Sequence, residues 1–141
     1  MKPQSAAFLE KAQALLGEAE TMLKVDLNDA AGRTAYLAGF HAAQALVFET
    51  HGRALKTHSG VRSEFARLVK DDARVDSELR GFLGYTYQLK EIADYETGPG
   101  SKVSANAARA ALKTARRFVE CVTSLIPANG LTSPAPRAKP S

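Results

Sequence analysis

The chain has 141 residues, of which 45% are hydrophobic and 24% are charged, and its formal net charge is +4 at pH 7. This composition suits one compact soluble domain with its own core, and a second domain does not fit comfortably. The N-terminus lacks the apolar core of a signal peptide and no segment approaches the roughly 20 apolar residues that cross a bilayer, so we expect a cytoplasmic protein without a membrane partner.

Helices are predicted throughout, because Ala, Leu, Lys, Glu and Arg are abundant and β-branched runs are few. The first helix spans roughly residues 5–24, where apolar side chains recur at helical spacing. A polar break follows, and Asn28 or Asp29 can accept a backbone N–H as the N-cap of a second helix that runs to about Thr50. Gly52 can supply the left-handed residue that ends this helix.

The second helix is apolar around most of its circumference, which predicts a central position in the fold. Arg33, His41 and Gln44 interrupt this apolar surface. A histidine in such a setting must reach a hydrogen-bond partner or lie at an edge. His41 is therefore interpreted first as a satisfied core histidine, with a catalytic or binding role as the alternative.

Residues 56–60 read KTHSG and combine a cation, an imidazole and the start of a short third helix. The free N–H groups of a helix start can hold a phosphate or a carboxylate, so Lys56 and His58 are candidates for an anion site. The structural alternative is that Ser59 caps the helix, His58 packs across the loop and Gly60 relieves crowding.

The fourth helix is predicted to begin at Asp76 or Ser77 and to end before Pro99, because proline disfavours helix in the residue before it. Near its end, Lys90 and Asp94 are four residues apart and can pair on one helix face. A surface ion pair is the ordinary explanation, whereas proton transfer requires a group with a displaced pKa. The candidate catalytic residues on this helix are Lys90, Asp94 and Tyr95.

Ser104 can cap a fifth helix, whose buried seam is flanked by a basic face. Such a face can bind RNA phosphates, although cationic faces that are only solvated are common. The basic residues are Arg109, Lys113, Arg116 and Arg117.

We expect a helical domain over residues 1–126 and a disordered tail over residues 127–141, where apolar content is too low to offset the entropy of ordering. The single cysteine, Cys121, cannot form an internal disulfide and is interpreted as a small buried hydrophobic residue. No Cys/His cluster has the spacing of zinc ligands, so neither a metal nor a cofactor is expected.

Three separated stretches resemble the HEPN domain superfamily, specifically its small prokaryotic branch. They are RTAYLAGFHAAQAL at 33–46, which is similar to an RxYYAAFHAA motif, KTHSG at 56–60, and ADY at 93–95, which is similar to the end of an LRxxADY motif. The resemblance covers roughly residues 5–126 in order and spacing. It implies an all-α fold, namely an up-and-down antiparallel bundle of four to five helices that forms a homodimer with a polar site along the dimer groove.

The resemblance also implies a function. Many HEPN proteins are metal-independent ribonucleases, and many are paired with a minimal nucleotidyltransferase in toxin–antitoxin or defence operons. In the nucleases, a late helix carries an arginine followed four to six residues later by a histidine. The arginine stabilises phosphate charge and the histidine moves the proton of the attacking 2′-hydroxyl.

This chain departs from that pattern, because Lys90 stands at the arginine position and Asp94 and Tyr95 stand where a histidine is expected. Lysine keeps the positive charge but loses the bidentate fork that suits a phosphate. Arg53 and His58 match the arginine–histidine spacing, but they fall in the loop after the second helix, so the catalytic role is not transferred to them. Tyr95 is a candidate for modification by a nucleotidyltransferase partner, as in some toxins of the family.

Two functions follow from the resemblance. The first is a HEPN protein of the toxin–antitoxin or defence type that acts on RNA as an atypical ribonuclease. The second is a non-catalytic module that docks a nucleotidyltransferase or binds a nucleotide, and a helical dimer whose polar residues only satisfy one another is the plainest alternative. The candidate binding residues are Arg33, Tyr36, His41, Lys56, His58, Arg109 and Arg116.

Overall fold

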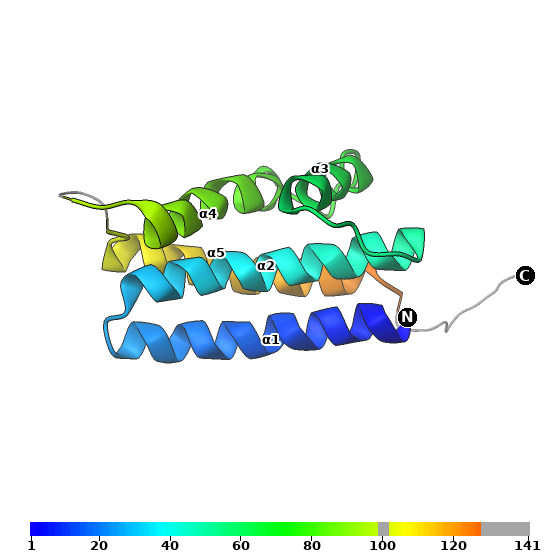
Figure 1. Cartoon of the computed structure of the whole chain (residues 1–141). Coiled ribbons are helices and arrows are strands. Elements are labelled where there is room, and N and C mark those ends of the chain that lie inside the picture. Colours follow the sequence, from blue (N-terminus) through cyan, green and yellow to red (C-terminus); the bar gives the residue numbers. More distant parts are fainter. Residues whose placement is uncertain (99–101, 128–141) are drawn as a thin grey trace, which may run out of the picture.

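The computed structural model describes residues 1–98 and 102–127, and these fold into five helices. In chain order they are α1 (Pro3–Lys24), α2 (Asn28–His51), α3 (His58–Leu68), α4 (Ser77–Tyr95) and α5 (Ala105–Leu125). The long helices α1, α2, α4 and α5 alternate in direction, and the shorter α3 lies beyond the start of α4, over the last part of α2 (Figure 1). The predicted all-α antiparallel bundle is confirmed. Within the described residues, no helix combines the length and the apolarity of a segment that spans a bilayer.

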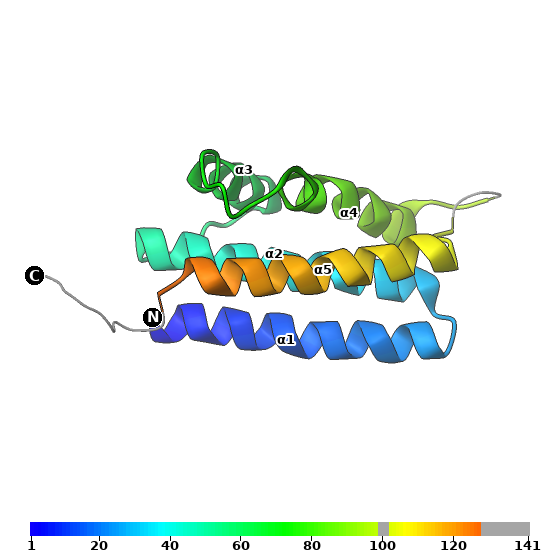
Figure 2. The same ribbon diagram turned by 180° about the vertical axis from the view of Figure 1, so that it is seen from behind.

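The central position predicted for α2 is confirmed, since α2 contacts each of the other four helices. Figure 2 shows α5 running alongside α2, with α1 on one side of this pair and α4 on the other. Small side chains allow such close approach from several directions, because they keep the helix surface near the backbone. The buried small residues of α2 are Ala31, Gly32, Ala35, Ala38, Gly39, Ala42, Ala43 and Ala45.

Three predicted helix ends are confirmed. The side chain of Asp76 accepts a hydrogen bond from the Leu79 N–H at the start of α4, at 2.9 Å. Ser104 accepts one from the Ala107 N–H at the start of α5, at 3.0 Å. Gly52 follows α2 with a φ of 75°, the left-handed conformation expected of a C-terminal glycine.

The cap predicted for α2 is wrong. The residue before the helix is Leu27, whose side chain cannot accept a hydrogen bond, and Asn28 is already the first helical residue. The Asp29 carboxylate instead accepts the N–H of Val103, at 2.7 Å, and so ties the start of α2 to the segment before α5. The capping preference predicts that this carboxylate accepts an N–H of its own helix, but it accepts the N–H of a residue far away in the sequence.

The cap predicted for α3 is also wrong, because Thr57 and not Ser59 occupies the N-cap position. The Thr57 hydroxyl accepts the N–H of Gly60, at 2.9 Å. A Cβ atom at position 60 would lie 2.8 Å from that hydroxyl oxygen, so glycine allows the close turn. The predicted role of Gly60 in relieving crowding is therefore confirmed.

The fourth helix ends at Tyr95, well before Pro99. Pro99, together with residues 128–141 of the predicted tail, lies outside the described residues. Cys121 was expected to be buried but is only partly so. Its Sγ donates to the Arg74 carbonyl at 3.5 Å, and burial raises the pKa of the thiol.

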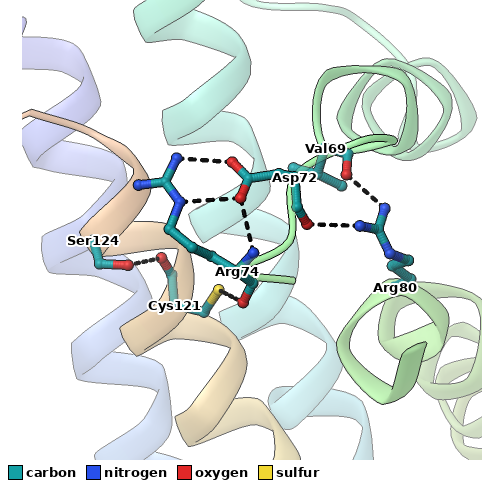
Figure 3. A network of polar contacts seen from close by, with 6 residues as sticks. All are labelled: Val69, Asp72, Arg74, Arg80, Cys121 and Ser124. Carbon is teal, nitrogen blue, oxygen red and sulfur yellow. Dashed lines mark hydrogen bonds and ion pairs between the residues drawn. The ribbon is translucent and has the colours of Figure 1, made fainter. Parts of the chain in front are cut away.

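The turn between α3 and α4 is held by Arg80 (Figure 3). Its guanidinium donates to the carbonyls of Val69, Lys70 and Asp72, at 2.5, 2.9 and 2.7 Å. The last carbonyls of a helix have no partner within the helix, so a side-chain cation can stabilise this end. Arg80 therefore fixes where α3 stops relative to α4.

The ion pairs of Glu64 predict how stability depends on pH. The Arg67 and His51 side chains donate to its carboxylate, at 3.0 Å from Arg67 Nε and 2.6 Å from His51 Nε2, and they lower the pKa of Glu64 to about 2. Because this pKa lies below its ordinary value of 4.5, the stabilisation is fully present above pH 4.5 and is lost as the pH falls towards about 2. Urea unfolding should therefore show a stability difference between wild type and Glu64→Gln that shrinks across this interval. A difference that is constant with pH would contradict this account.

Candidate functional site

A group of polar and aromatic side chains gathers where α2, α3 and α4 meet. Most of these residues are three or four positions apart within their helix, a spacing that places them on one helix face, and Tyr95 follows directly after one of them at the end of α4. We call this group the cationic face. It consists of Arg33 and Tyr36 on α2, His58 and Arg62 on α3, and Tyr87, Lys90, Asp94 and Tyr95 on α4.

The predicted pairing of Lys90 with Asp94 is confirmed, and the structure adds a second cation to it. Lys90 Nζ lies 3.3 Å from one carboxylate oxygen of Asp94, and Arg33 Nε lies 2.9 Å from the other. The Asp94 side chain retains 22% of its exposure. Since both of its oxygens accept from cations, Asp94 is suited to orienting Arg33 and Lys90.

Lys90 is a partly covered cation, with 16% of its side chain exposed. Its ammonium lies 5.6 Å from the centre of the Tyr87 ring and 5.1 Å from that of Tyr95. Partial burial alone would lower the pKa of Lys90, but the hydrogen bond to Asp94 and the nearby Tyr95 outweigh it and raise that pKa. Lys90 is therefore charged at neutral pH.

His58 is joined to the buried Tyr36. The Tyr36 hydroxyl lies 2.8 Å from His58 Nδ1, and the imidazole stacks on Phe40 with 4.1 Å between ring centres. Burial lowers the pKa of His58, and the charges of Lys90 and Arg62 lower it further. Burial also raises the pKa of Tyr36 to about 12. A neutral imidazole thus faces a neutral phenol at neutral pH.

Sequence reasoning missed Arg62. Its guanidinium carbon lies 4.1 Å from the centre of the Tyr87 ring, in a cation–π contact. The Nε atom is buried and finds no hydrogen-bond acceptor among the residues that the structure describes. The signal that could have revealed Arg62 is its position four residues after His58, which places both on one face of α3.

The structure supports the structural interpretation of His41. Its Nδ1 lies 2.6 Å from the side-chain oxygen of Gln44, and its ring stacks against Phe8 with 6.3 Å between centres. Burial lowers the pKa of His41. The remaining loop candidate, Lys56, is exposed between α2 and α3, as is Arg53, to which no role was assigned.

The basic residues of α5 do not join the cationic face. Arg116 pairs with Glu20 of α1 at 3.2 Å, beside a shallow cavity of about 440 Å³. This pair lies away from the cationic face, because α1 contacts neither α3 nor α4 among the described helices. Arg117 pairs with Asp76 at 2.7 Å. Arg109 donates to Asn106 at 2.9 Å. Part of the predicted basic face is therefore neutralised by carboxylates.

Across residues 1–98 and 102–127, no group of three or more His, Cys, Asp or Glu side chains is arranged to hold a metal ion. The chemistry available at the cationic face is that of cations, tyrosine hydroxyls and one neutral imidazole. Such a set can bind a phosphate and move a proton.

Comparisons with known proteins place these features in context. The family model of the HEPN domain matches residues 5–125. Among solved structures, TT1696 from Thermus thermophilus is similar, with a TM-score of 0.72 and 18% sequence identity over 87% of this chain and 98% of that chain. At this identity the likeness concerns the fold. Comparison with curated proteins finds no significant match.

Proposed function

This chain belongs to the HEPN domain family, and on that premise we propose that it acts on RNA as the HEPN component of a toxin–antitoxin or defence system. In this proposal it works as a homodimer of the small prokaryotic branch and is an atypical, metal-independent ribonuclease. The observation that carries the proposal is the cationic face, where cations from three helices gather and two of them lie over tyrosine rings. These cations are Arg33, Arg62 and Lys90.

The cationic face has the two components that single-stranded RNA binding uses. Positive side chains attract the phosphate backbone, and aromatic rings stack on unpaired bases. Arg62 makes no ion pair among the described residues, so its charge remains for a ligand. The ring of Tyr95 is 68% exposed beside Lys90, within reach of a base whose phosphate contacts that lysine.

The three residues of α4 then take different roles. Lys90 contacts phosphate, Tyr95 stacks with a base, and Asp94 holds Lys90 and Arg33 in place through its two carboxylate oxygens. In this assignment of roles, Asp94 is not the base that moves a proton. A carboxylate facing RNA is also tolerated better when two cations balance its charge.

We expect Lys90→Ala to weaken the binding of a single-stranded RNA and to reduce its salt dependence. Losing one phosphate contact should lower the slope of log affinity against log salt by about 0.7, measured by fluorescence anisotropy. Lys113→Ala on α5 is the matched control, because Lys113 is an exposed lysine outside the cationic face. An equal loss in both variants would show that RNA binding does not depend on the cationic face, and a larger loss in Lys113→Ala would place it on α5. No salt-dependent binding by the folded protein would refute an action on RNA.

A second candidate function is that of a module that docks a minimal nucleotidyltransferase or binds a nucleotide. Its support is that α4 carries no histidine and that Asp94 is engaged by two cations. The exposed Tyr95 hydroxyl would then be the group that a partner modifies. Absence of RNA binding in the anisotropy experiment would favour this candidate.

A further inference from the structure

We propose that His58, oriented by Tyr36, is the residue that moves the proton at the cationic face, with Arg62 and Lys90 stabilising the charge of the RNA phosphate. This assignment rests on the proposed action on RNA. It places the reacting imidazole at the start of α3 instead of on the late helix α4.

Helix α4 carries no histidine, and Lys90 stands at the arginine position of the family motif, whereas α3 carries both a histidine and an arginine. His58 begins the helix, and Arg62 follows four residues later on the same face. Lys90 completes the set from α4, and the centre of the Tyr87 ring lies 4.1 Å from the Arg62 guanidinium carbon and 5.6 Å from the Lys90 ammonium. Helices α3 and α4 together thus supply a histidine and two cations.

Tyr36 has the properties of a positioning residue for this histidine. Its side chain is 0% exposed and packs on the rings of Phe40 and Tyr87, so the hydroxyl is fixed. When the proton of the imidazole is on Nδ1, that N–H donates to the Tyr36 oxygen and Nε2 can accept a proton. His58 is exposed, which leaves it accessible to a ligand. After proton uptake, Nδ1 still donates to Tyr36, so the charged ring keeps its orientation.

Arg62 makes no ion pair among the described residues, so its positive charge remains for an anion. Its Nε is covered by protein, so a phosphate would bind through the terminal nitrogens of the guanidinium. The stacking on Tyr87 fixes the plane of the guanidinium. The surrounding charges also suit a neutral base, because Lys90 and Arg62 both disfavour the imidazolium and His41 acts in the same direction.

The chemical step follows from these positions. His58 Nε2 takes the proton of a ribose 2′-hydroxyl, and the 2′-oxygen attacks the adjacent phosphorus. The bond from phosphorus to the 5′-oxygen breaks, and the leaving oxygen takes a proton from water. The products are a 2′,3′-cyclic phosphate and a free 5′-hydroxyl, and His58 returns its proton to solvent.

The variants that test this assignment are His58→Asn, Tyr36→Phe and Arg62→Gln. Asparagine keeps a polar group near the position of Nδ1 but cannot accept the proton, so the Tyr36 contact is retained while the chemistry is lost. His51→Asn and Arg67→Gln are matched controls, since both residues pair with Glu64 away from the cationic face. Thermal melting of each variant checks that the fold is retained.

The measurements are single-turnover cleavage of a single-stranded RNA with EDTA present, and RNA affinity by anisotropy. We expect His58→Asn to slow cleavage by about 100-fold or more while its affinity changes by no more than about twofold. Arg62→Gln should slow cleavage by about 10- to 100-fold. Both controls should cleave as wild type does.

Tyr36→Phe should shift the acidic limb of the kcat/KM profile to lower pH, because the imidazolium loses its acceptor at Nδ1. Titratable or charged groups near His58 come from all three helices: Tyr36 and His41 from α2, Arg62 from α3, and Lys90 from α4. A variant that only loosened the packing would lower the rate without moving this limb.

A His58→Asn variant that cleaves at the wild-type rate would overturn the assignment while leaving the proposed function in place. A folded wild type that binds RNA but does not cleave it would overturn both the assignment and the proposed ribonuclease activity, while leaving RNA binding. If instead the folded wild type does not bind RNA at all, the proposed function itself fails.

Discussion

Replacing Gly39 by alanine is expected to lower the free energy of unfolding by about 3 kcal/mol, because α2 and α4 touch at this position. A Cβ atom at position 39 would lie 2.3 Å from a ring carbon of Phe82 and 3.1 Å from another. The ring cannot simply move away, since Phe82 is buried and stacks on Phe118 with 4.9 Å between centres. The helix axes must therefore separate, or Phe82 must leave its packed position.

Gly81→Ala is the matched control for this substitution. Gly81 lies within α4, and a Cβ atom there would meet nothing within 4 Å. Alanine in an open helical position should raise stability by about 0.5–1 kcal/mol through its better helix propensity. Urea unfolding of the two variants compares them directly. If Gly39→Ala were as stable as wild type, the close contact between α2 and α4 would be wrong.

The second substitution with a large expected effect is Arg80→Met, which should cost about 2 kcal/mol of unfolding free energy. Methionine keeps an unbranched apolar stem but removes the guanidinium that donates to three carbonyls after α3. These carbonyls would then lose charge-assisted hydrogen bonds that only water could replace. Hydrogen exchange should show faster opening of the amides in the last turn of α3.

Arg74→Met separates this effect from the loss of any nearby charge. Arg74 lies in the same turn but pairs with Asp72 at the surface, at 2.8 Å, where ion pairs contribute little. Arg74→Met should therefore lower the free energy of unfolding by less than Arg80→Met does. Equal losses in the two variants would show that Arg80 acts through general electrostatics and not through its contacts with carbonyls.

Much of the fold could be predicted from the sequence, because helix periodicity and two of the caps depend on residues close in the chain. Asp76 and Ser104 cap helices as local rules expect. Asp29 does not, since it bonds to Val103 of the segment before α5. Capping preferences consider only residues close in sequence, whereas the N–H of Val103 comes near Asp29 only in the folded bundle.

The candidate site could be predicted only in part. The pairing of Lys90 with Asp94 follows from a spacing of four on one helix, whereas Arg33 joins them from another helix. Arg62 resembles any charged residue on the outer side of a short helix, and its place over Tyr87 depends on how α3 crosses α4. Which charged residues belong to the cationic face therefore depends on contacts between helices, which the sequence pattern of one helix does not contain.

The peripheral position of α3 has a consequence for how such a protein can diverge. Helix α3 packs on α2 and α4 and touches α5 through Phe65 and Phe118, whose ring centres lie 5.2 Å apart, yet it supplies both His58 and Arg62. The packing among α1, α2 and α5 does not depend on the polar side chains that α3 carries. A lineage can thus exchange those side chains, and with them the ligands it recognises, while it inherits the same bundle.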